Sequence, residues 1–346
     1  MTAKTKEIVA VSTLAACIAI FFVIDIVFGS VVMNRPTEPE YILVIPSVRH
    51  ASINVQSYIS NPIQTLTMRG ALSSFFPTKL FGTSYRKTRW IDNVNAMYQA
   101  YRRHFSMIYL EYNIPKKEYD VIFVLKKNNR RFHFANGAML PNEVYNRKKH
   151  FVPYYYAYPT DGCVMITRYP VVFTDKLYAM DRNYEFYYDL YGRTRKTIND
   201  QLEFIQFGRF SFPMNTGTEC YEAAKSVFKE FELLRHSTPK LERWFNSIKS
   251  ISSFSPRTIA NTGRPSTHTF SIAMDILTRD NRPNYWYWTS KLRKKWWTVP
   301  PEERAYIPPE VIEIFEAHGF CWGGKWERYD MMHFEYKPEN LLRMIR

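Results

Sequence analysis

The chain has 346 residues, of which 46% are hydrophobic and 17% aromatic, so it is long and apolar enough for one or two globular domains and is not a disordered chain. Its 47 Lys and Arg residues outnumber 32 Asp and Glu residues, and the formal net charge of +15 favours anionic partners such as nucleic acid, an acidic membrane face or a bacterial wall polymer. The basic residues form short clusters with acidic residues among them, which is more typical of solvated surface than of a dedicated binding stripe.

The N-terminal segment predicts a membrane anchor. Residues 8–24, "IVAVSTLAACIAIFFVI", carry no charge, and their length is close to the roughly 20 residues that a spanning helix needs. Lys4 and Lys6 precede this segment, so the positive-inside rule places the N-terminus in the cytoplasm and the chain after residue 34 outside it. The alternative is a signal peptide cleaved near residues 27–29, after which the protein would be secreted.

The first half of the chain predicts helices and one hairpin. Apolar residues recur at helical spacing in residues 90–105, and residues 119–137 alternate on either side of an Asn-Asn turn, which is typical of a β-hairpin. Residues 187–192 and 219–234 predict further helices, and the second has an apolar face made by Ala223, Val227, Phe228 and Phe231.

The C-terminal part predicts strands around one helix. After a turn-rich loop at 250–265, residues 270–276 alternate as in a half-buried strand. Residues 308–320 predict a helix that begins at proline and stops at Gly319, and residues 330–336 alternate as a second strand. The fold class is therefore α+β, with a small antiparallel sheet and flanking helices.

Two polar residues flank the first of these strands. His268 and Asp275 are seven positions apart, so they would point to opposite faces of a straight strand, and a turn or bulge near Ser271 is needed for them to meet. Taken singly, such a histidine is more often a satisfied core residue, and such an aspartate is more often a turn or cap residue. Together they are two of the three ligands that hydrolytic zinc sites typically use.

The third ligand is expected on the later strand. His333 lies there, with Glu335 on the same face of the strand. Asp330, three residues before His333, is placed to act on the metal-bound water as a general base. The interpretation is one metal ion held by two imidazoles and one carboxylate.

The cysteines support no zinc finger. Cys17 lies in the apolar N-terminal segment, and Cys163, Cys220 and Cys321 show no CxxC or other metal-ligand spacing. In an oxidising compartment these three permit at most one disulfide within the chain. We expect Cys220 to take part in it, because it opens a helix that must be held against the zinc domain.

Two motifs resemble a known family. "STHTFSIAMD" is similar to the S-x-H-x-x-G-x-A-x-D motif, and "GFCWGGKWERYDMMHFEY" to the second motif, of the D-alanyl-D-alanine carboxypeptidase and L-alanyl-D-glutamate endopeptidase group of zinc peptidases, metallopeptidase family fifteen. The similarity extends more loosely back to about residue 118. It implies a fold of the hedgehog and D-Ala-D-Ala peptidase type around one zinc ion, in a peptidase region at 118–346 with its core at about 195–346. The parts that precede this region are the anchor at 1–33 and a linker and membrane-proximal region at 34–117.

The resemblance also implies roles for single residues. His268, Asp275 and His333 would ligate Zn²⁺, Asp330 would be the catalytic acid/base, and Arg257 would stabilise the oxyanion. The other implied residues, which would line the substrate or support the ligands, are Ser266, Trp326 and Glu335. Ser271 departs from the motif, because the family has glycine there; if that glycine adopts a positive φ, serine costs about 1 kcal/mol.

The expected function is hydrolysis of peptidoglycan stem peptides, as a D-Ala-D-Ala carboxypeptidase or an L-Ala–D-Glu endopeptidase. The expected location is the bacterial inner membrane, with a single span and the catalytic region on the periplasmic or wall side. The alternative is a non-catalytic envelope-binding or scaffold protein that keeps the peptidase fold. A nucleic-acid partner rests on charge alone and conflicts with an exported body, so we expect none.

Overall fold

The computed structural model describes residues 33–34, 42–43, 45–46, 84–113, 118–156, 158, 181–259, 263–279, 284–287, 299–300, 303–326 and 328–342. The predicted membrane anchor and Cys163 lie outside these residues. Across the ranges just given, no helix has both the length and the apolar character required to span a bilayer. The boundaries predicted after residues 33 and 117 stay predictions.

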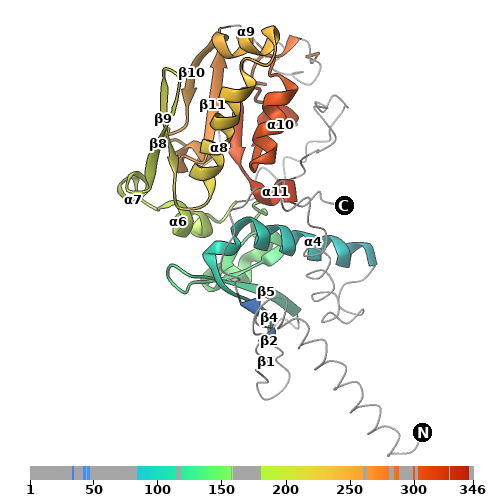
Figure 1. Ribbon diagram of the computed structural model, residues 1–346. Coiled ribbons are helices and arrows are strands. Elements are labelled where there is room, and N and C mark those ends of the chain that lie inside the picture. Colours follow the sequence, from blue (N-terminus) through green and yellow to red (C-terminus); the bar gives the residue numbers. More distant parts are fainter. Residues whose placement is uncertain are drawn as a thin grey trace, which may run out of the picture. The chain divides into compact units, whose positions relative to one another are not determined.

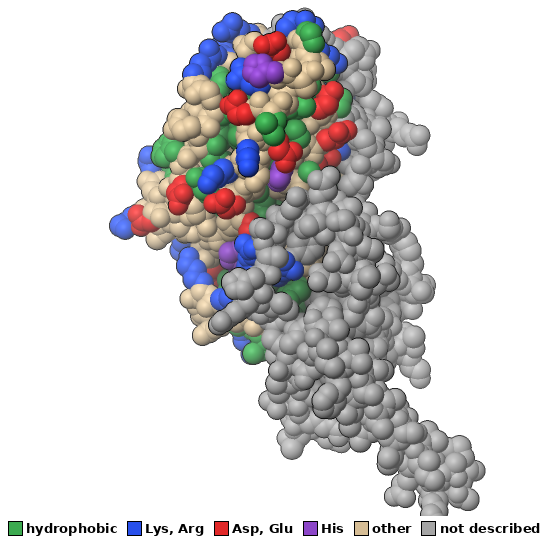
Figure 2. All heavy atoms as spheres, in the orientation of Figure 1, with side chains coloured by type: hydrophobic (Ala, Val, Ile, Leu, Met, Phe, Trp, Pro, Cys, Tyr) green, Lys and Arg blue, Asp and Glu red, His purple; other side chains and the backbone are tan. Residues whose placement is uncertain are grey.

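The chain forms two compact units that alternate along the sequence. The first unit comprises Met1–Ala51, Tyr101–Ala135 and Met139–Asn146, and the second comprises Ser52–Ala100, Asn136–Ala138 and Arg147–Arg346. On the face drawn in Figure 2, Lys and Arg side chains of the described residues lie among Asp and Glu side chains. That mixture agrees with solvated basic clusters on this face.

The first unit contains an antiparallel sheet with strand order β3-β4-β5-β6-β7. Its strands are β3 (Ile45–Pro46), β4 (Phe105–Asn113), β5 (Glu118–Leu125), β6 (Arg131–His133) and β7 (Leu140–Pro141), and β1 (Met33–Asn34) pairs separately with β2 (Ile42–Leu43). The hairpin predicted at 119–137 is confirmed, because β5 and β6 pair across a turn. Asn129 takes a positive φ of 54° in that turn, a conformation that asparagine tolerates better than most residues.

Most described helices belong to the second unit. Its elements are α4 (Ser84–Tyr101, whose last residue belongs to the first unit), α6 (Glu185–Tyr191), α7 (Arg195–Asn199), β8 (Leu202–Phe207), β9 (Phe210–Asn215), α8 (Cys220–Leu234), α9 (Pro239–Ser247), β10 (Ile248–Ser252), β11 (Ala273–Thr278), α10 (Pro309–Ala317), β12 (Phe320–Trp322), β13 (His333–Tyr336) and α11 (Pro338–Leu342). The short 3₁₀ helices are η2 (Arg102–His104), η3 (Ala135–Gly137), η4 (Asn142–His150), η5 (Thr267–Phe270) and η8 (Gly323–Lys325). The four predicted helices are confirmed as α4, α6, α8 and α10, and the α+β class is confirmed with them.

The second unit is built on a four-stranded antiparallel sheet with the order β10-β11-β13-β12. Helices α8 and α10 run alongside this sheet (Figure 1); α10 packs on the sheet, and α8 packs on α10. Phe315 of α10 stacks on Phe334 of β13 with ring centroids 3.8 Å apart, and Phe231 of α8 lies 5.4 Å from Phe315. Because side chains alternate along a strand, His333 and Glu335 point to the face opposite these helices.

The strand predicted at 270–276 begins later than expected. Thr267–Phe270 form the 3₁₀ helix η5, which ends at Ser271 with φ 54° and ψ 40°, and β11 starts only at Ala273. Phe270 and Ile272 are both buried, and this burial produces strand-like alternation in a stretch that is a turn. The correction matters because His268 then lies on the 3₁₀ helix and not on a strand.

The expected disulfide of Cys220 is not formed. Cys220 and Cys321 are free, buried thiols, and burial raises the pKa of both well above the ordinary value. Helix α8, which Cys220 opens, is instead held by ring contacts such as those of Phe228 with Phe207 at 5.1 Å and with Phe212 at 4.9 Å. Hydrophobic packing therefore fixes the helix without a covalent link at its first residue.

Candidate metal centre

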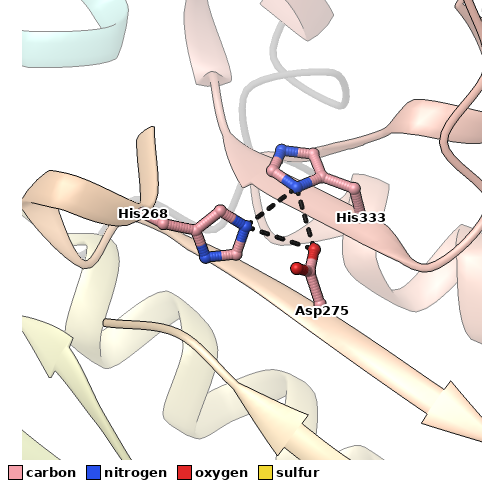
Figure 3. A group of neighbouring side chains, drawn as sticks. All are labelled: His268, Asp275 and His333. Carbon is pink, nitrogen blue, oxygen red and sulfur yellow. Dashed lines mark hydrogen bonds and ion pairs between the residues drawn. The ribbon is translucent and has the colours of Figure 1, made fainter. Parts of the chain in front are cut away.

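Three side chains from three separate elements converge on one point. His268 comes from η5, Asp275 from β11 and His333 from β13, and their ligand atoms face one another (Figure 3). His268 Nε2 lies 3.2 Å from Asp275 Oδ1 and 3.1 Å from His333 Nδ1, and the third side of the triangle, from His333 Nδ1 to Asp275 Oδ1, is 3.0 Å. Among the residues that the structure describes, this is the group with the geometry to hold a metal ion.

The backbone explains how the three meet. Asp275 and His333 are direct register partners across β11 and β13, so both side chains leave the sheet on the same face. His268 reaches them because the chain reverses at Ser271, which has left-handed backbone angles. The turn expected near Ser271 is thus present, and it has the positive φ that the family glycine would supply without strain. The Ser271 hydroxyl donates a hydrogen bond to the Pro213 carbonyl oxygen at 2.8 Å.

The protonation of His268 points to a cation. Its Nδ1 lies 2.8 Å from the Ser253 carbonyl oxygen, which only accepts, so Nδ1 carries the hydrogen. In a neutral ring, Nε2 then carries a lone pair and no hydrogen. It faces Asp275 Oδ1, which also has only lone pairs to offer. A carbonyl behind a ligating histidine is the usual arrangement that fixes the ring and its tautomer. A positive ion bound between these two atoms would turn their mutual repulsion into attraction to the ion.

The distances fit such an ion. Tetrahedral ligands about 2.0–2.1 Å from a zinc ion are separated from one another by roughly 3.3 Å. The three measured edges, 3.0 to 3.2 Å, are close to this value. Two imidazole nitrogens and one carboxylate oxygen also form a donor set that zinc accepts in hydrolases. The site residues therefore fit a metal ion on geometry, tautomer and donor type.

His333 is supported from behind by a carboxylate. Its Nε2 lies 3.6 Å from Glu335 Oε2, and Glu335 Oε1 accepts a hydrogen bond from the Tyr156 hydroxyl at 2.9 Å. The Tyr156 oxygen in turn accepts a hydrogen bond from Trp326 Nε1 at 3.1 Å. The Trp326 indole lies beside the His333 ring, with centroids 5.1 Å apart. Glu335 and Trp326 are thus both placed next to a ligand.

The charged groups of the site shift one another's pKa values. Burial alone would raise the pKa of Asp275, but the neighbouring imidazole groups of His268 and His333 hold it well below its usual range. Burial alone would lower the pKa of His333, but the Asp275 and Glu335 carboxylates, which accept hydrogen bonds from its ring, raise it to about 10. A cation that binds His333 therefore has to displace a proton, so metal affinity is expected to increase with pH.

Asp330 lies beside the ligands with one buried oxygen. Oδ1 is buried and has no hydrogen-bond partner among the described residues. Burial raises the pKa of Asp330 to about 7, and repulsion from Asp275 adds to the effect, while His333 and Arg257 oppose it. A carboxyl group with a pKa near 7 can both take and return a proton at neutral pH.

Gly323 allows this arrangement. The Asp330 backbone N–H donates to the Gly323 carbonyl oxygen at 3.0 Å. A Cβ atom at position 323 would lie 2.6 Å from the Asp330 carbonyl oxygen and 3.3 Å from the Cβ atom of His333. Real side chains do not occupy such space, so glycine at 323 is required for Asp330 and His333 to pass this close.

Arg257 lies next to the Asp275 carboxylate. Its Nη2 atom is 4.0 Å from Asp275 Oδ2, and its side chain is 52% exposed. The backbone of Arg257 is fixed by Thr269, whose hydroxyl donates to the Arg257 carbonyl oxygen at 2.8 Å and accepts from its N–H at 3.1 Å. Ser266 also pairs with Arg257, through its backbone N–H at 3.0 Å, and its side chain accepts from the N–H of His268 at 3.4 Å. An exposed guanidinium with a fixed backbone can face a bound anion or a developing negative charge.

Three supporting residues were not predicted from the sequence. Tyr156 contacts Glu335 and Trp326, Ser253 orients His268 through its carbonyl oxygen, and Thr269 fixes Arg257. For Thr269 the sequence did hold a signal, because it lies next to His268 in the first motif. Ser253 acts through its backbone and Tyr156 is 179 residues from its partner Glu335, so no local pattern indicates either.

The comparison with protein families agrees with the site. Residues 260–336 match the family model described as D-alanyl-D-alanine carboxypeptidase. The family recognised from the two motifs is thereby confirmed, and this segment belongs to metallopeptidase family fifteen. It contains His268, Asp275, Asp330 and His333, whereas Arg257 precedes it. No curated protein and no solved structure matches the chain.

Proposed function

We propose that the protein is a zinc-dependent peptidase that hydrolyses the stem peptides of peptidoglycan. The observation that supports this most is the triangle of His268, Asp275 and His333 with Asp330 beside it, in a segment of the peptidase family. His268 offers a lone pair, Asp275 offers a charge, and Asp330 titrates near neutral pH, so the site contains ligands and an acid/base together.

A bound zinc ion would supply Lewis acidity that lowers the pKa of water and polarises the scissile carbonyl. The residues of the chain do the remaining work. Asp330 accepts the proton of the attacking water and delivers it to the leaving amine, as its raised pKa permits. Arg257, which is exposed on the Asp275 side, stabilises the negative charge that develops on the carbonyl oxygen.

The second candidate function is a non-catalytic envelope-binding or scaffold protein that retains the fold and the metal. Ser271 is the observation that favours it, because this residue replaces the family glycine in a left-handed turn. The hydrogen bond from Ser271 to Pro213 compensates part of that strain, and the ligand geometry is intact. We therefore favour the peptidase.

The experiment is digestion of purified muropeptides by the full-length chain, followed by mass spectrometry. Loss of a terminal D-Ala residue identifies a carboxypeptidase, and separation of L-Ala from D-Glu identifies an endopeptidase. The Asp330→Asn variant, which keeps the size of the side chain, is the matched control for contaminating activity. Unchanged muropeptides with the zinc-loaded wild type would contradict the peptidase and favour the scaffold protein.

We further propose that residues 8–24 anchor the protein in the bacterial inner membrane with its peptidase region outside the cytoplasm. The uncharged segment after two lysines supports this. The protein should stay with membranes after alkaline extraction, and external protease should reach the peptidase region. Release into the soluble fraction, with a new N-terminus near residue 30, would instead show a cleaved signal peptide.

A further inference from the structure

A short aromatic segment outside the family match lies against the metal centre. We call residues 152–156 and 158 the tyrosine segment, since Tyr154, Tyr156 and Tyr158 alternate along it. All three belong to the second unit, together with the residues that ligate the metal. The segment precedes the family match at 260–336 by about a hundred residues, so the family motifs do not account for it.

Each alternate tyrosine has its own attachment. The Tyr154 carbonyl oxygen accepts from the buried Lys337 Nζ at 3.4 Å. The Tyr158 hydroxyl accepts from the backbone N–H of Trp322 at 2.8 Å and also contacts the Glu316 carboxylate. These three contacts hold the segment on both sides of Tyr156.

Tyr156, between them, reaches the metal centre itself. Its backbone N–H donates to Asn340 Oδ1 at 2.9 Å, which fixes the main chain. Its hydroxyl donates to Glu335 Oε1 at 2.9 Å and accepts from Trp326 Nε1 at 3.1 Å. The direction of both bonds is settled by chemistry, because an ionised carboxylate only accepts and an indole N–H only donates.

Both partners of the Tyr156 hydroxyl touch His333. Glu335 Oε2 lies 3.6 Å from His333 Nε2, and the Trp326 ring lies 5.1 Å from the His333 ring. One hydroxyl group thus fixes two side chains that orient the same metal ligand. A carboxylate behind a ligating imidazole sets the ring angle and raises the basicity of the ligand, but only while the carboxylate itself is held in place.

We propose that Tyr156 is a positioning residue of the metal centre: its hydroxyl fixes Glu335 behind His333 and Trp326 beside it. The family-matched segment then supplies the ligands, and the tyrosine segment supplies the group that aligns one of them. This inference rests on the metal site of the proposed function and is independent of which peptide bond is cut.

The test is the zinc dissociation constant of the full-length chain, measured by competition with a chelator. Tyr156→Phe keeps the ring and removes only the hydroxyl, so it should weaken zinc binding by about 10–100-fold, the usual effect of losing such a supporting partner. Tyr155→Phe is the matched control. That hydroxyl donates to the Asn136 carbonyl oxygen at 2.7 Å and accepts from the Asn93 amide at 3.0 Å, so its loss should leave zinc affinity unchanged.

A double-mutant cycle identifies the route of the effect. Glu335→Gln should weaken zinc binding by itself, and adding Tyr156→Phe should then change the constant by less than about 3-fold, because the group on which Tyr156 acts has already been altered. If Tyr156→Phe folds poorly, a second cycle takes its place. It combines Glu335→Gln with Trp326→Phe, which removes the other hydrogen bond to the Tyr156 hydroxyl.

Four outcomes are decisive. Weaker zinc binding by Tyr156→Phe with a normal melting temperature of the metal-free protein supports the inference. A lower melting temperature with wild-type zinc affinity overturns it and leaves Tyr156 a purely structural residue. A wild-type chain that binds no zinc at all overturns the proposed function and this inference with it. Normal zinc binding by both Tyr156→Phe and Tyr155→Phe overturns this inference alone.

Discussion

Asp275 and His333 face each other directly across strands β11 and β13, and their ligand atoms are 3.0 Å apart. The hydrogen-bonded register of the sheet therefore sets the spacing of two ligands, and the left-handed turn at Ser271 brings His268 to them. A shift of the register by one residue would turn one of the pair to the opposite face. Sheet pairing and one left-handed turn together assemble the ligand set.

Removing any ligand should remove the metal. His268→Ala, Asp275→Ala and His333→Ala should each lose most of their zinc, because a lost ligand removes one bond and the orientation of the other two. Metal content per chain, measured by atomic spectroscopy, checks this. His236→Ala is the matched control, since His236 is an exposed residue that contacts Glu242, and it should keep its zinc.

Asp330→Asn should separate metal binding from catalysis. Asparagine keeps the size of the side chain but does not accept a proton, so zinc should stay near one equivalent while turnover falls by roughly 10²–10⁴. Asp200→Asn, at an exposed i,i+4 ion pair with Lys196, is the control. Full activity of Asp330→Asn would contradict the mechanism, and loss of zinc would show that Asp330 is a ligand.

Arg257→Ala should keep its zinc and lose turnover by about 10²–10³, the usual effect of removing one group that stabilises an oxyanion. Its guanidinium is 4.0 Å from Asp275 and makes no ligand bond, so metal content should not change. Arg193→Ala removes an exposed arginine that pairs with Glu185 and serves as control. Kinetics equal to wild type would assign Arg257 to the solvated surface.

The contribution of Asp330 to the free energy of unfolding of the metal-free protein should decrease as pH rises from 4 to 7. Burial raises the pKa of Asp330 to about 7 in the folded state, against roughly 3.9 in the unfolded chain. The folded state therefore holds a proton that the unfolded chain releases in this range, and stability present below pH 4 is lost as pH rises through 7.

Asp330→Asn isolates this contribution from those of Asp275 and Glu335, whose pKa values shift in the opposite direction. The variant should gain free energy of unfolding over wild type at pH 8, by at most about 4 kcal/mol at 1.36 kcal/mol per pKa unit, and gain little at pH 4. Chemical unfolding of both proteins with a chelator present measures the difference. An equal gain at both pH values would contradict the raised pKa.

Ser271→Ala should destabilise the protein by about 1 kcal/mol, because alanine keeps the positive φ of 54° and loses the hydrogen bond to Pro213. Ser271→Gly should be close to neutral, since relief of the left-handed strain offsets the lost hydrogen bond. Melting temperatures of the three proteins give the order. If Ser271→Gly is much less stable than Ser271→Ala, the turn is not strained by serine.

The sequence was most informative where function and local pattern coincide. His268, Asp275, Asp330 and His333 stand in compact motifs, and the structure brings all four together as the motifs suggest. The long helices α4 and α8 were predicted from 3.6-residue periodicity, and α10 was predicted from its proline start and its Gly319 stop. The segment 270–276 misled because Phe270 and Ile272 are buried for reasons of packing, and burial alone does not distinguish a turn from a strand.

Other features depend on long-range contacts and leave no local pattern. The hairpin of β8 and β9 was not predicted. It supports the site, because the Pro213 carbonyl oxygen of β9 accepts a hydrogen bond from the Ser271 hydroxyl. The support of Glu335 by Tyr156 spans 179 residues of sequence and appears only once the chain is folded. The membrane anchor is predicted from the uncharged segment 8–24 and the lysines before it, and this segment lies outside the residues that the structure describes.

The assembly of the ligands by sheet pairing links the metal to the lifetime of the protein. An unfolded chain holds His268, Asp275 and His333 on disconnected segments, so a metal ion would bind almost only to the folded state, and its binding free energy would add to the free energy of unfolding. A chelator would then remove the activity and also raise the fraction of unfolded molecules, which proteases cleave. Where the metal is scarce, the protein would then be lost by degradation as well as by loss of activity.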